Sequence, residues 1–222
     1  MHDRPVHSRI PNRYPDYDVL AKRDGPSWND KTREVVAQRL AITARPLFFS
    51  ASEFPAVEAI AARIVPQPAT RPAIPVASLV DRKLHAGISD GYRPAGMPRE
   101  REAWRRGLRA LDVEARHAHG QSFASLAEAE QDQLLRRAEG GELKAPDWGD
   151  MRCVDFFKRR LLRDIVMAYY SHPAAWSEVG WGGPASPRGY VRLDDNARDP
   201  WEAAEATPGH EAEAARINRH VR

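Results

Sequence analysis

Cysteine is almost absent from this 222-residue chain, whose single thiol, Cys153, excludes an internal disulfide. A lone cysteine is typical of proteins that work in a reducing compartment. The chain also lacks an apolar run long enough to cross a membrane, and no apolar segment of signal-peptide type follows Met1. We therefore expect a protein that does not insert directly into a membrane and that is cytoplasmic as encoded.

Strand-type alternation of apolar and polar residues is missing as well, and apolar residues recur at helical spacing instead. The net charge of +3 arises from intermixed acids and bases, so it gives little support to a nucleic-acid partner. The 18 prolines and the low mean hydropathy indicate that part of the chain is extended rather than packed. These features predict an all-α protein with about six helices in one irregular bundle and with extended N- and C-terminal arms.

Local signals indicate where the expected helices begin and end. Ser50 and Glu53 have capping-box spacing, with Ser52 as the other candidate cap, and Ser27 with Asp30 has the same spacing. In the helix after Pro75 we expect Asp81 to face solvent. The expected helices cover approximately residues 28–42, 50–64, 76–86, 98–119, 127–138 and 155–171.

The stretch from Asp155 to Tyr190 organises the rest of the chain. An apolar helix is followed by an aromatic loop rich in glycine and proline, and Pro173 ends the helix near Ser171 because it disfavours helical backbone at His172. A helix that is apolar on two sides needs cover on both. Its apolar residues divide between one face with Phe157, Leu161, Ile165 and Tyr169 and another with Phe156, Met167 and Tyr170.

Three regions follow from this organisation: an extended N-terminal arm over 1–27, a helical domain over 28–173, and an aromatic loop with an extended acidic tail over 174–222. The N-terminal arm is either a disordered end or an arm anchored on a partner by its aromatic residues. Large aromatic rings among glycines and prolines need cover, either from the chain's own helices or from another chain. For Trp176, Trp181 and Tyr190 we expect this cover to come from docking. The predicted partner-binding residues are Tyr14, Tyr17, Trp28, Tyr169, Tyr170, His172, Trp176, Trp181, Tyr190 and Trp201.

No catalytic, cofactor-binding or metal-binding residue is predicted. His117 and His119 stand two positions apart on an expected helix, so their side chains diverge, and no third ligand is spaced near them. The sequence has no Gly-x-Gly-x-x-Gly after a strand, and no Ser, His and Asp set in recognisable context. We interpret Cys153 as a small packed residue.

Two further features have a structural and a functional interpretation. His172 is either a capping or hydrogen-bonding residue at a helix end or a general base, and a base would need other groups around it. Lys158, Arg159, Arg160 and Arg163 form a basic helix face, which we interpret as a solvated or partner-facing surface.

A series of short motifs resembles the gluconate 2-dehydrogenase subunit 3 family between about residues 47 and 190. Each motif is weak alone, and their order and spacing together carry the resemblance. The motifs are Phe48-Phe49-Ser50 leading to Ile64-Val65-Pro66, Val80-Asp81-Arg82, Arg105-Arg106-Gly107-Leu108 through Asp112, Gly120 with Phe123 and Leu126, Gln131-Asp132 with Leu134-Leu135, Phe156-Phe157, Tyr170-Ser171-His172-Pro173 and Gly180-Trp181.

This resemblance implies a small, non-catalytic accessory subunit. Its partner would be a large flavoprotein of the glucose-methanol-choline oxidoreductase type that oxidises sugars, sugar acids, polyols or related alcohols. The FAD and the catalytic histidine would belong to that partner, and this chain would hold no cofactor. In many such assemblies a cytochrome or another acceptor takes the electrons.

Family members often carry a twin-arginine export signal, and here Arg9 and Arg13 are separated with no apolar stretch behind them. We therefore expect a periplasmic location only if a signal-bearing partner exports the chain. Two hypotheses of different class result: an accessory subunit of a flavin-dependent dehydrogenase, or a free-standing helical binding protein with a small-molecule pocket under residues 176–190. A catalytic role of the chain itself ranks third.

Overall fold

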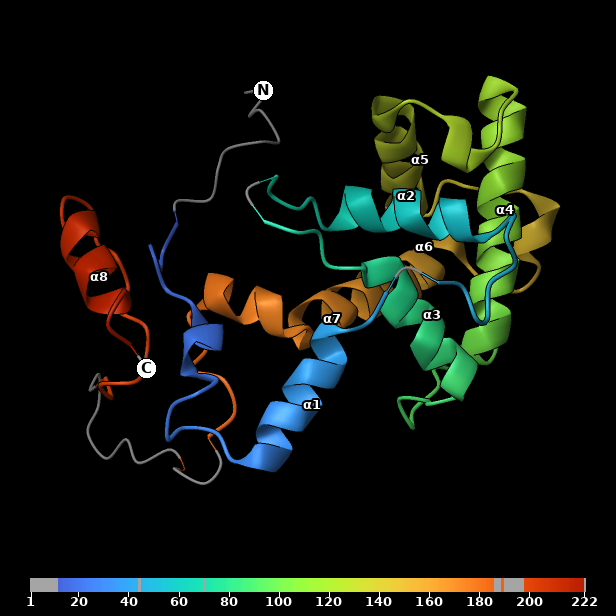
Figure 1. Ribbon diagram of the computed structural model, residues 1–222. Coiled ribbons are helices and arrows are strands. Elements are labelled where there is room, and N and C mark those ends of the chain that lie inside the picture. The colour runs from blue at the N-terminus through green and yellow to red at the C-terminus, as the bar shows by residue number, and fades with distance from the viewer. Residues whose placement is uncertain (1–11, 44, 70, 186–188, 190–197, 222) are drawn as a thin grey trace. The chain divides into compact units, whose positions relative to one another are not determined.

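The computed structural model describes residues 12–43, 45–69, 71–185, 189 and 198–221, and this part of the chain contains helices and loops but no strand. The predicted all-α class is confirmed, with eight α-helices in the described residues instead of about six (Figure 1). No helix there is both long and apolar enough to cross a membrane. The α-helices are α1 (Asp30–Leu40), α2 (Phe54–Ile64), α3 (Val76–Ala86), α4 (Glu100–His119), α5 (Glu128–Gly140), α6 (Cys153–Phe156), α7 (Arg163–Ser171) and α8 (Glu211–Asn218).

The chain forms two compact units. The central unit is one continuous stretch, residues 42–169, whereas the terminal unit combines the described parts of 1–41 and 170–222. This grouping joins the two chain ends, which the sequence presented as separate arms. The expected region boundaries near residues 27 and 173 are not tested by it and stay a prediction.

The central unit is built around aromatic side chains between α4 and α6. Trp104 lies edge-on to Phe49 and to Phe156, with ring centres 5.7 and 5.8 Å apart, and Trp148 contacts Phe156 from the other side. Trp104 and Phe156 are completely buried. Around them α2 contacts α3 and α5, and α4 contacts α5 and α6 (Figure 1). Such edge-to-face pairs add to the free energy gained from burial.

The predicted apolar helix at the centre of the sequence is present as one helical run, α6–η4–α7, whose middle segment η4 (Phe157–Leu162) is a π-helix. The face with Leu161, Ile165 and Tyr169 is buried, as expected. The second face is only half covered: Phe156 packs in the core, while Met167 and Tyr170 are 53% and 45% exposed. A π-helical turn adds a residue per turn and so shifts the side chains that follow it.

The local cap signals were partly correct. Ser50 and Glu53 form the predicted reciprocal capping box, because the Ser50 N–H donates to Glu53 Oε2 and the Glu53 N–H donates to Ser50 Oγ. For α1 the prediction was wrong, since Asn29 rather than Ser27 accepts from the Thr32 N–H and caps the helix.

Asp81 is the clearest correction within α3. The sequence placed it in solvent, but it is fully buried and accepts hydrogen bonds from the backbone N–H groups of Leu47, Phe48 and Phe49 at 2.6–3.0 Å. Three donors compensate the loss of hydration of one carboxylate. Asp81 thereby fixes the segment that leads into α2.

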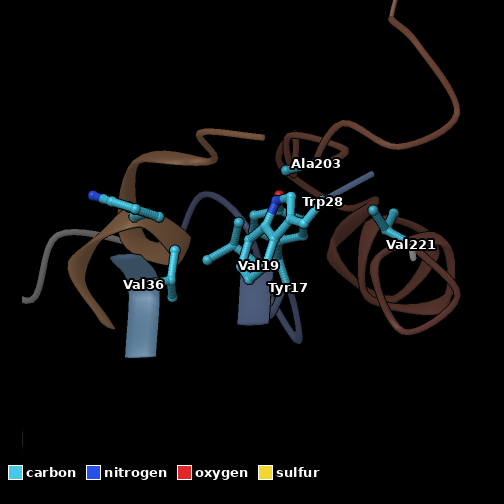
Figure 2. Packing of buried hydrophobic residues seen from close by; sticks show 7 residues of the cluster. Tyr17, Val19, Trp28, Val36, Ala203 and Val221 are labelled. Atoms are coloured by element: carbon cyan, nitrogen blue, oxygen red, sulfur yellow. The ribbon is translucent and has the colours of Figure 1, made fainter. Parts of the chain in front are cut away.

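The terminal unit has its own apolar core, formed by Tyr17, Val19, Trp28, Val36, Trp176, Ala203 and Val221 (Figure 2). Two short 3₁₀ helices take part, η1 (Val19–Lys22) and η5 (Pro173–Val179), and η5 contacts both η1 and α1. The ammonium group of Lys22 is buried beneath them, where it donates to the carbonyls of Gly182 and Trp201. Residues from both ends of the sequence therefore share one core.

Helix α8 lies in the segment that was expected to form an extended acidic tail. Its Asn218 is 1% exposed and donates to the carbonyls of Pro15 and Ala204, while its side-chain oxygen accepts from the Ala204 N–H at 2.7 Å. The packed residues of this segment are small, among them Ala203, Ala204 and Ala214. Such residues give little hydrophobic periodicity, so the helix left no clear signal in the sequence.

Candidate functional site

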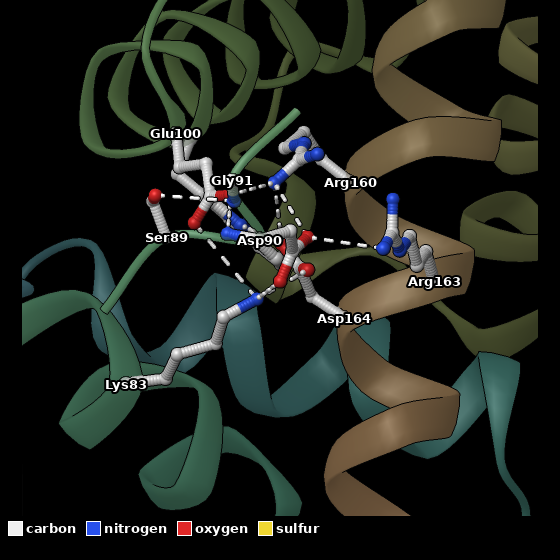
Figure 3. Close-up of polar contacts among 9 residues, drawn as sticks. Lys83, Ser89, Asp90, Gly91, Glu100, Arg160, Arg163 and Asp164 are labelled. Carbon is white, nitrogen blue, oxygen red and sulfur yellow. Dashed lines mark hydrogen bonds and ion pairs between the residues drawn. The ribbon is translucent and has the colours of Figure 1, made fainter. Parts of the chain in front are cut away.

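Six charged side chains of the central unit meet in one ionic cluster (Figure 3). Lys83 of α3 lies 2.8 Å from Asp90 and 3.2 Å from Asp164, measured from its ammonium nitrogen to the carboxylate oxygens. Arg160 lies 3.1 Å from Glu100 and 3.6 Å from Asp164. Arg163 completes the cluster at 3.6 Å from Asp90. Three acids thus face three bases, and the formal charges cancel.

The cluster is held by neighbours that are themselves buried. The indole N–H of Trp104 donates to Asp164 at 2.7 Å, so the aromatic core and the charges are joined directly. Asp164 and Arg160 have side chains that are 1% and 4% exposed. Buried charges persist only where partners compensate the loss of hydration.

Arg160 was expected on a solvated or partner-facing helix face, and for this residue the expectation was wrong. Lys158 and Arg159 are exposed, but Arg160 lies in the π-helical segment and points into the cluster. The available signal was the spacing of four positions between Arg160 and Asp164, which places opposite charges side by side on a helix. The acids contributed by other elements, Asp90 and Glu100, had no such local signal.

The cluster shifts the pKa values of two of its members. Burial alone would lower the pKa of Lys83, but the hydrogen bond to Asp90 and the negative charges of Asp164 and Glu100 outweigh it and raise this pKa. Burial would raise the pKa of Asp90, but Lys83 and the two arginines lower it instead. Both groups are therefore held in their charged forms.

The loop that joins α3 to α4, residues 87–99, contributes Asp90 to this cluster. Ile88 and Tyr92 are 63% and 71% exposed, although both are large apolar side chains. They line a pocket of about 630 Å³ together with Arg93, Arg99 and Arg101. Asp90 fixes the loop to the cluster, and its backbone N–H donates to Glu100 at 3.1 Å. The central unit therefore combines a rigid charged base with an exposed apolar surface.

Among the predicted partner-binding residues, five are buried within this chain: Tyr17, Trp28, Tyr169, His172 and Trp176. Trp176 was expected to find its cover only by docking, and here it packs in the core of the terminal unit and donates to the Tyr170 carbonyl at 2.9 Å. Gly180 permits the close approach of Tyr14, because a Cβ on this residue would lie 2.4 Å from the Tyr14 ring. Whether these residues also contact a partner stays a prediction.

The other predicted residues retain accessible surface or fall outside the described part. Tyr170 and Trp181 are 45% and 40% exposed, and Tyr14 and Trp201 are half-buried. The ring of Trp181 lies edge-on to that of Trp176, with centres 4.5 Å apart. Tyr190 lies outside the described residues. Among those of these aromatic residues that the structure describes, Tyr170 and Trp181 have the largest exposed fractions.

The remaining histidines and the cysteine considered in the sequence have the following places in the structure. His172 caps η5, since its Nδ1 accepts from the Ala174 N–H at 3.3 Å. Cys153 is buried at the start of α6. His119 pairs with Glu130 at 3.3 Å, while His117 faces solvent. In the described residues no group of three or more His, Cys, Asp or Glu side chains is placed to hold a metal ion.

Comparison with known proteins decides the family. A match to gluconate 2-dehydrogenase subunit 3 covers residues 51–183, which is more than half of the chain and includes α2 to η5. The chain belongs to the gluconate 2-dehydrogenase subunit 3 family. No curated protein and no solved structure gives a match. The subunit 3 match includes the ionic cluster and the α3–α4 loop, as well as Tyr170 and Trp181.

Proposed function

We propose that this chain is a non-catalytic accessory subunit that binds and stabilises a large FAD-dependent dehydrogenase of the glucose-methanol-choline type. The observation that carries the proposal is the match to subunit 3 of gluconate 2-dehydrogenase over residues 51–183, because a third subunit implies a multi-chain enzyme. The complex would oxidise sugars, sugar acids, polyols or related alcohols. The flavin would lie in the large subunit, and a cytochrome or another acceptor would receive the electrons.

The terminal unit supports this proposal with exposed apolar side chains next to a rigid core. Tyr170, Val179 and Trp181 are 40–47% exposed. The buried Trp176 donates a hydrogen bond to the Tyr170 carbonyl, and its ring packs edge-on against that of Trp181. Grouped aromatic side chains on a fixed base are typical of residues that anchor protein interfaces. We propose that these side chains contact the large subunit.

The alternative of a small-molecule pocket under residues 176–190 has less support. A Cβ on Gly183 would lie 2.8 Å from Val19 and 3.3 Å from Trp28, so side chains of the terminal core fill the space against this glycine. The described part of the loop is therefore packed against its own chain. An accessory role accounts better for the apolar surface that remains exposed.

The test is co-expression of the chain with a candidate large flavoprotein of the glucose-methanol-choline type, followed by purification through a tag on the small chain. We expect the flavoprotein to co-purify in a fixed ratio, with a flavin absorption spectrum and dehydrogenase turnover. The small chain purified alone should show neither flavin nor turnover. A small chain that binds no flavoprotein, or that oxidises an alcohol by itself, would refute the proposal.

A further inference from the structure

The α3–α4 loop carries the two most exposed of the large apolar side chains in the described chain, Tyr92 at 71% and Ile88 at 63%. Single exposed apolar residues are common on protein surfaces. Here two of them belong to one short loop and line the same pocket of about 630 Å³. The combination of exposed aromatic and aliphatic groups with a concave surface is typical of a binding site.

This loop is held in place by contacts with the ionic cluster and by a hydrogen bond within the loop. Asp90 is fastened through its carboxylate to Lys83 and Arg163 and through its backbone N–H to Glu100. At the other end of the loop Arg93 donates to the Met97 carbonyl at 2.8 Å, and Met97 is 3% exposed. A segment that is already ordered loses less conformational entropy when a partner binds. The apolar side chains are thus displayed on a preorganised base.

The charge around the pocket is positive once internal pairs are taken into account. Glu100 is paired with Arg160, and Glu102 with Arg106 at 2.6 Å. Arg99, at the N-terminal end of α4, is exposed and forms no side-chain hydrogen bond or ion pair within the described part of the chain. Arg93 and Arg101 are exposed beside it. A partner that fits this rim therefore carries carboxylates around an apolar group.

We propose that this surface, formed by Ile88, Tyr92 and Arg99, docks an acidic segment of the large flavoprotein subunit that inserts an apolar side chain into the pocket. The inference rests on the proposed accessory function and adds a second contact surface, on the central unit. Tyrosine and arginine are the residue types that most often dominate the binding energy of interfaces. The ionic cluster serves here as the support that fixes the loop.

The experiment compares four variants of the small chain in the co-expressed complex. Tyr92→Ser removes the exposed ring, and Arg99→Glu reverses the charge at a helix N-terminus, where a carboxylate is compatible with the helix. Val113→Ser and Arg109→Glu are the matched controls, since both residues are exposed on α4 and lie more than two helical turns from Arg99. Circular dichroism and thermal unfolding establish that each variant keeps the fold.

The fraction of assembled complex is measured by sedimentation velocity through a dilution series at low and high salt. We expect Tyr92→Ser and Arg99→Glu each to weaken assembly about ten-fold or more, while the controls stay within about two-fold. The wild-type complex should weaken as salt rises, and Arg99→Glu should reduce this dependence because it removes one of the screened attractions.

Each other outcome overturns a distinct claim. If the wild-type chain forms no complex, both the accessory function and this docking surface are refuted. If the wild-type complex forms and both loop variants assemble as well as the controls, only the docking surface is refuted. If the isolated small chain self-associates and Tyr92→Ser abolishes that association, the occupant is a second copy of this chain, and the flavoprotein is excluded from the site.

Discussion

Gly107 shows at the scale of one residue how closely α4 and α6 approach. A Cβ at this position would lie 2.3 Å from Cζ of Phe156, whose ring is completely buried against Trp104. Glycine in the middle of a helix normally lowers its stability by about 1 kcal/mol relative to alanine. Here the ring of Phe156 occupies the space that a side chain at position 107 would fill.

We predict that Gly107→Ala destabilises the protein by about 1–3 kcal/mol, because the methyl group must displace a buried ring. Gly140→Ala is the control: its Cβ would meet only the carboxylate end of Glu142, a flexible side chain, at 3.0 Å. That substitution should be neutral or slightly stabilising. Chemical unfolding of the two variants measures the difference, and equal stabilities would show that the Phe156 ring yields without cost.

Single residues also show the limit of prediction from the sequence. The Ser50–Glu53 capping box and the cap formed by His172 depend on neighbours two or three positions away, and the sequence offered each as one of two candidate interpretations. Asp81 and Asn218 could not be placed, because their partners lie at least 32 and 14 positions away. Their burial depends on which backbone groups the fold brings to them.

At the scale of elements, the helical run α6–η4–α7 was predicted from its apolar periodicity, but its π-helical segment was not. That segment carries Arg160 into the ionic cluster, where α3, the α3–α4 loop, α4 and α7 contribute the partners. A periodic pattern reports which side of a helix is apolar. It does not report which charged residues of other elements will meet there, so the candidate site had to be found in the structure.

The pKa shifts in this cluster define a pH range in which it stabilises the fold. Because the pKa of Asp90 is lowered in the folded protein, this residue adds to the free energy of unfolding at pH values above its unfolded pKa of about 3.9. This stabilisation is lost as the pH falls through the folded pKa. The raised pKa of Lys83 gives a contribution that is present below about 10.4 and is lost as the pH rises through its folded value. The cluster is therefore fully effective between about pH 4 and pH 10.

We predict that Asp90→Asn lowers the free energy of unfolding by about 1–3 kcal/mol at pH 7, because Lys83 loses a charged partner in a partly buried site. The difference from wild type should shrink as the pH falls below about 4, where Asp90 is protonated first in the unfolded chain and then, at lower pH, in the folded protein. Unfolding at several pH values, followed by tryptophan fluorescence, measures it. The control Asp150→Asn removes an exposed pair with Arg106 and should cost less than about 1 kcal/mol. A difference that stays constant down to pH 2 would contradict the assignment.

At the scale of the whole molecule, the two ends of the chain fold together in the terminal unit. The carbonyl of Pro15 accepts from Asn218, 203 positions away, and the Ala206 N–H donates to the carbonyl of Arg13. The sequence indicated that the aromatic residues of both ends need cover, but it gave no means of deciding whether that cover comes from the same chain. Much of it does, and Trp181 is the tryptophan of this unit that keeps the largest exposed fraction described here.

We predict that Trp181→Ala weakens assembly with the large flavoprotein subunit by about thirty-fold, equivalent to about 2 kcal/mol, because an exposed ring on a fixed base is a typical interface anchor. Trp176 also packs in the terminal core, and the Trp181 carbonyl that accepts from Tyr17 is retained, so the terminal unit should remain folded. Val35→Ala, a 36% exposed position on α1, is the control. Sedimentation velocity of the co-expressed complex measures assembly, and turnover per flavin of the assembled fraction should be unchanged. If Trp181→Ala assembles normally but abolishes turnover, this residue belongs to a catalytic or electron-transfer site, and the non-catalytic role proposed for the chain is wrong.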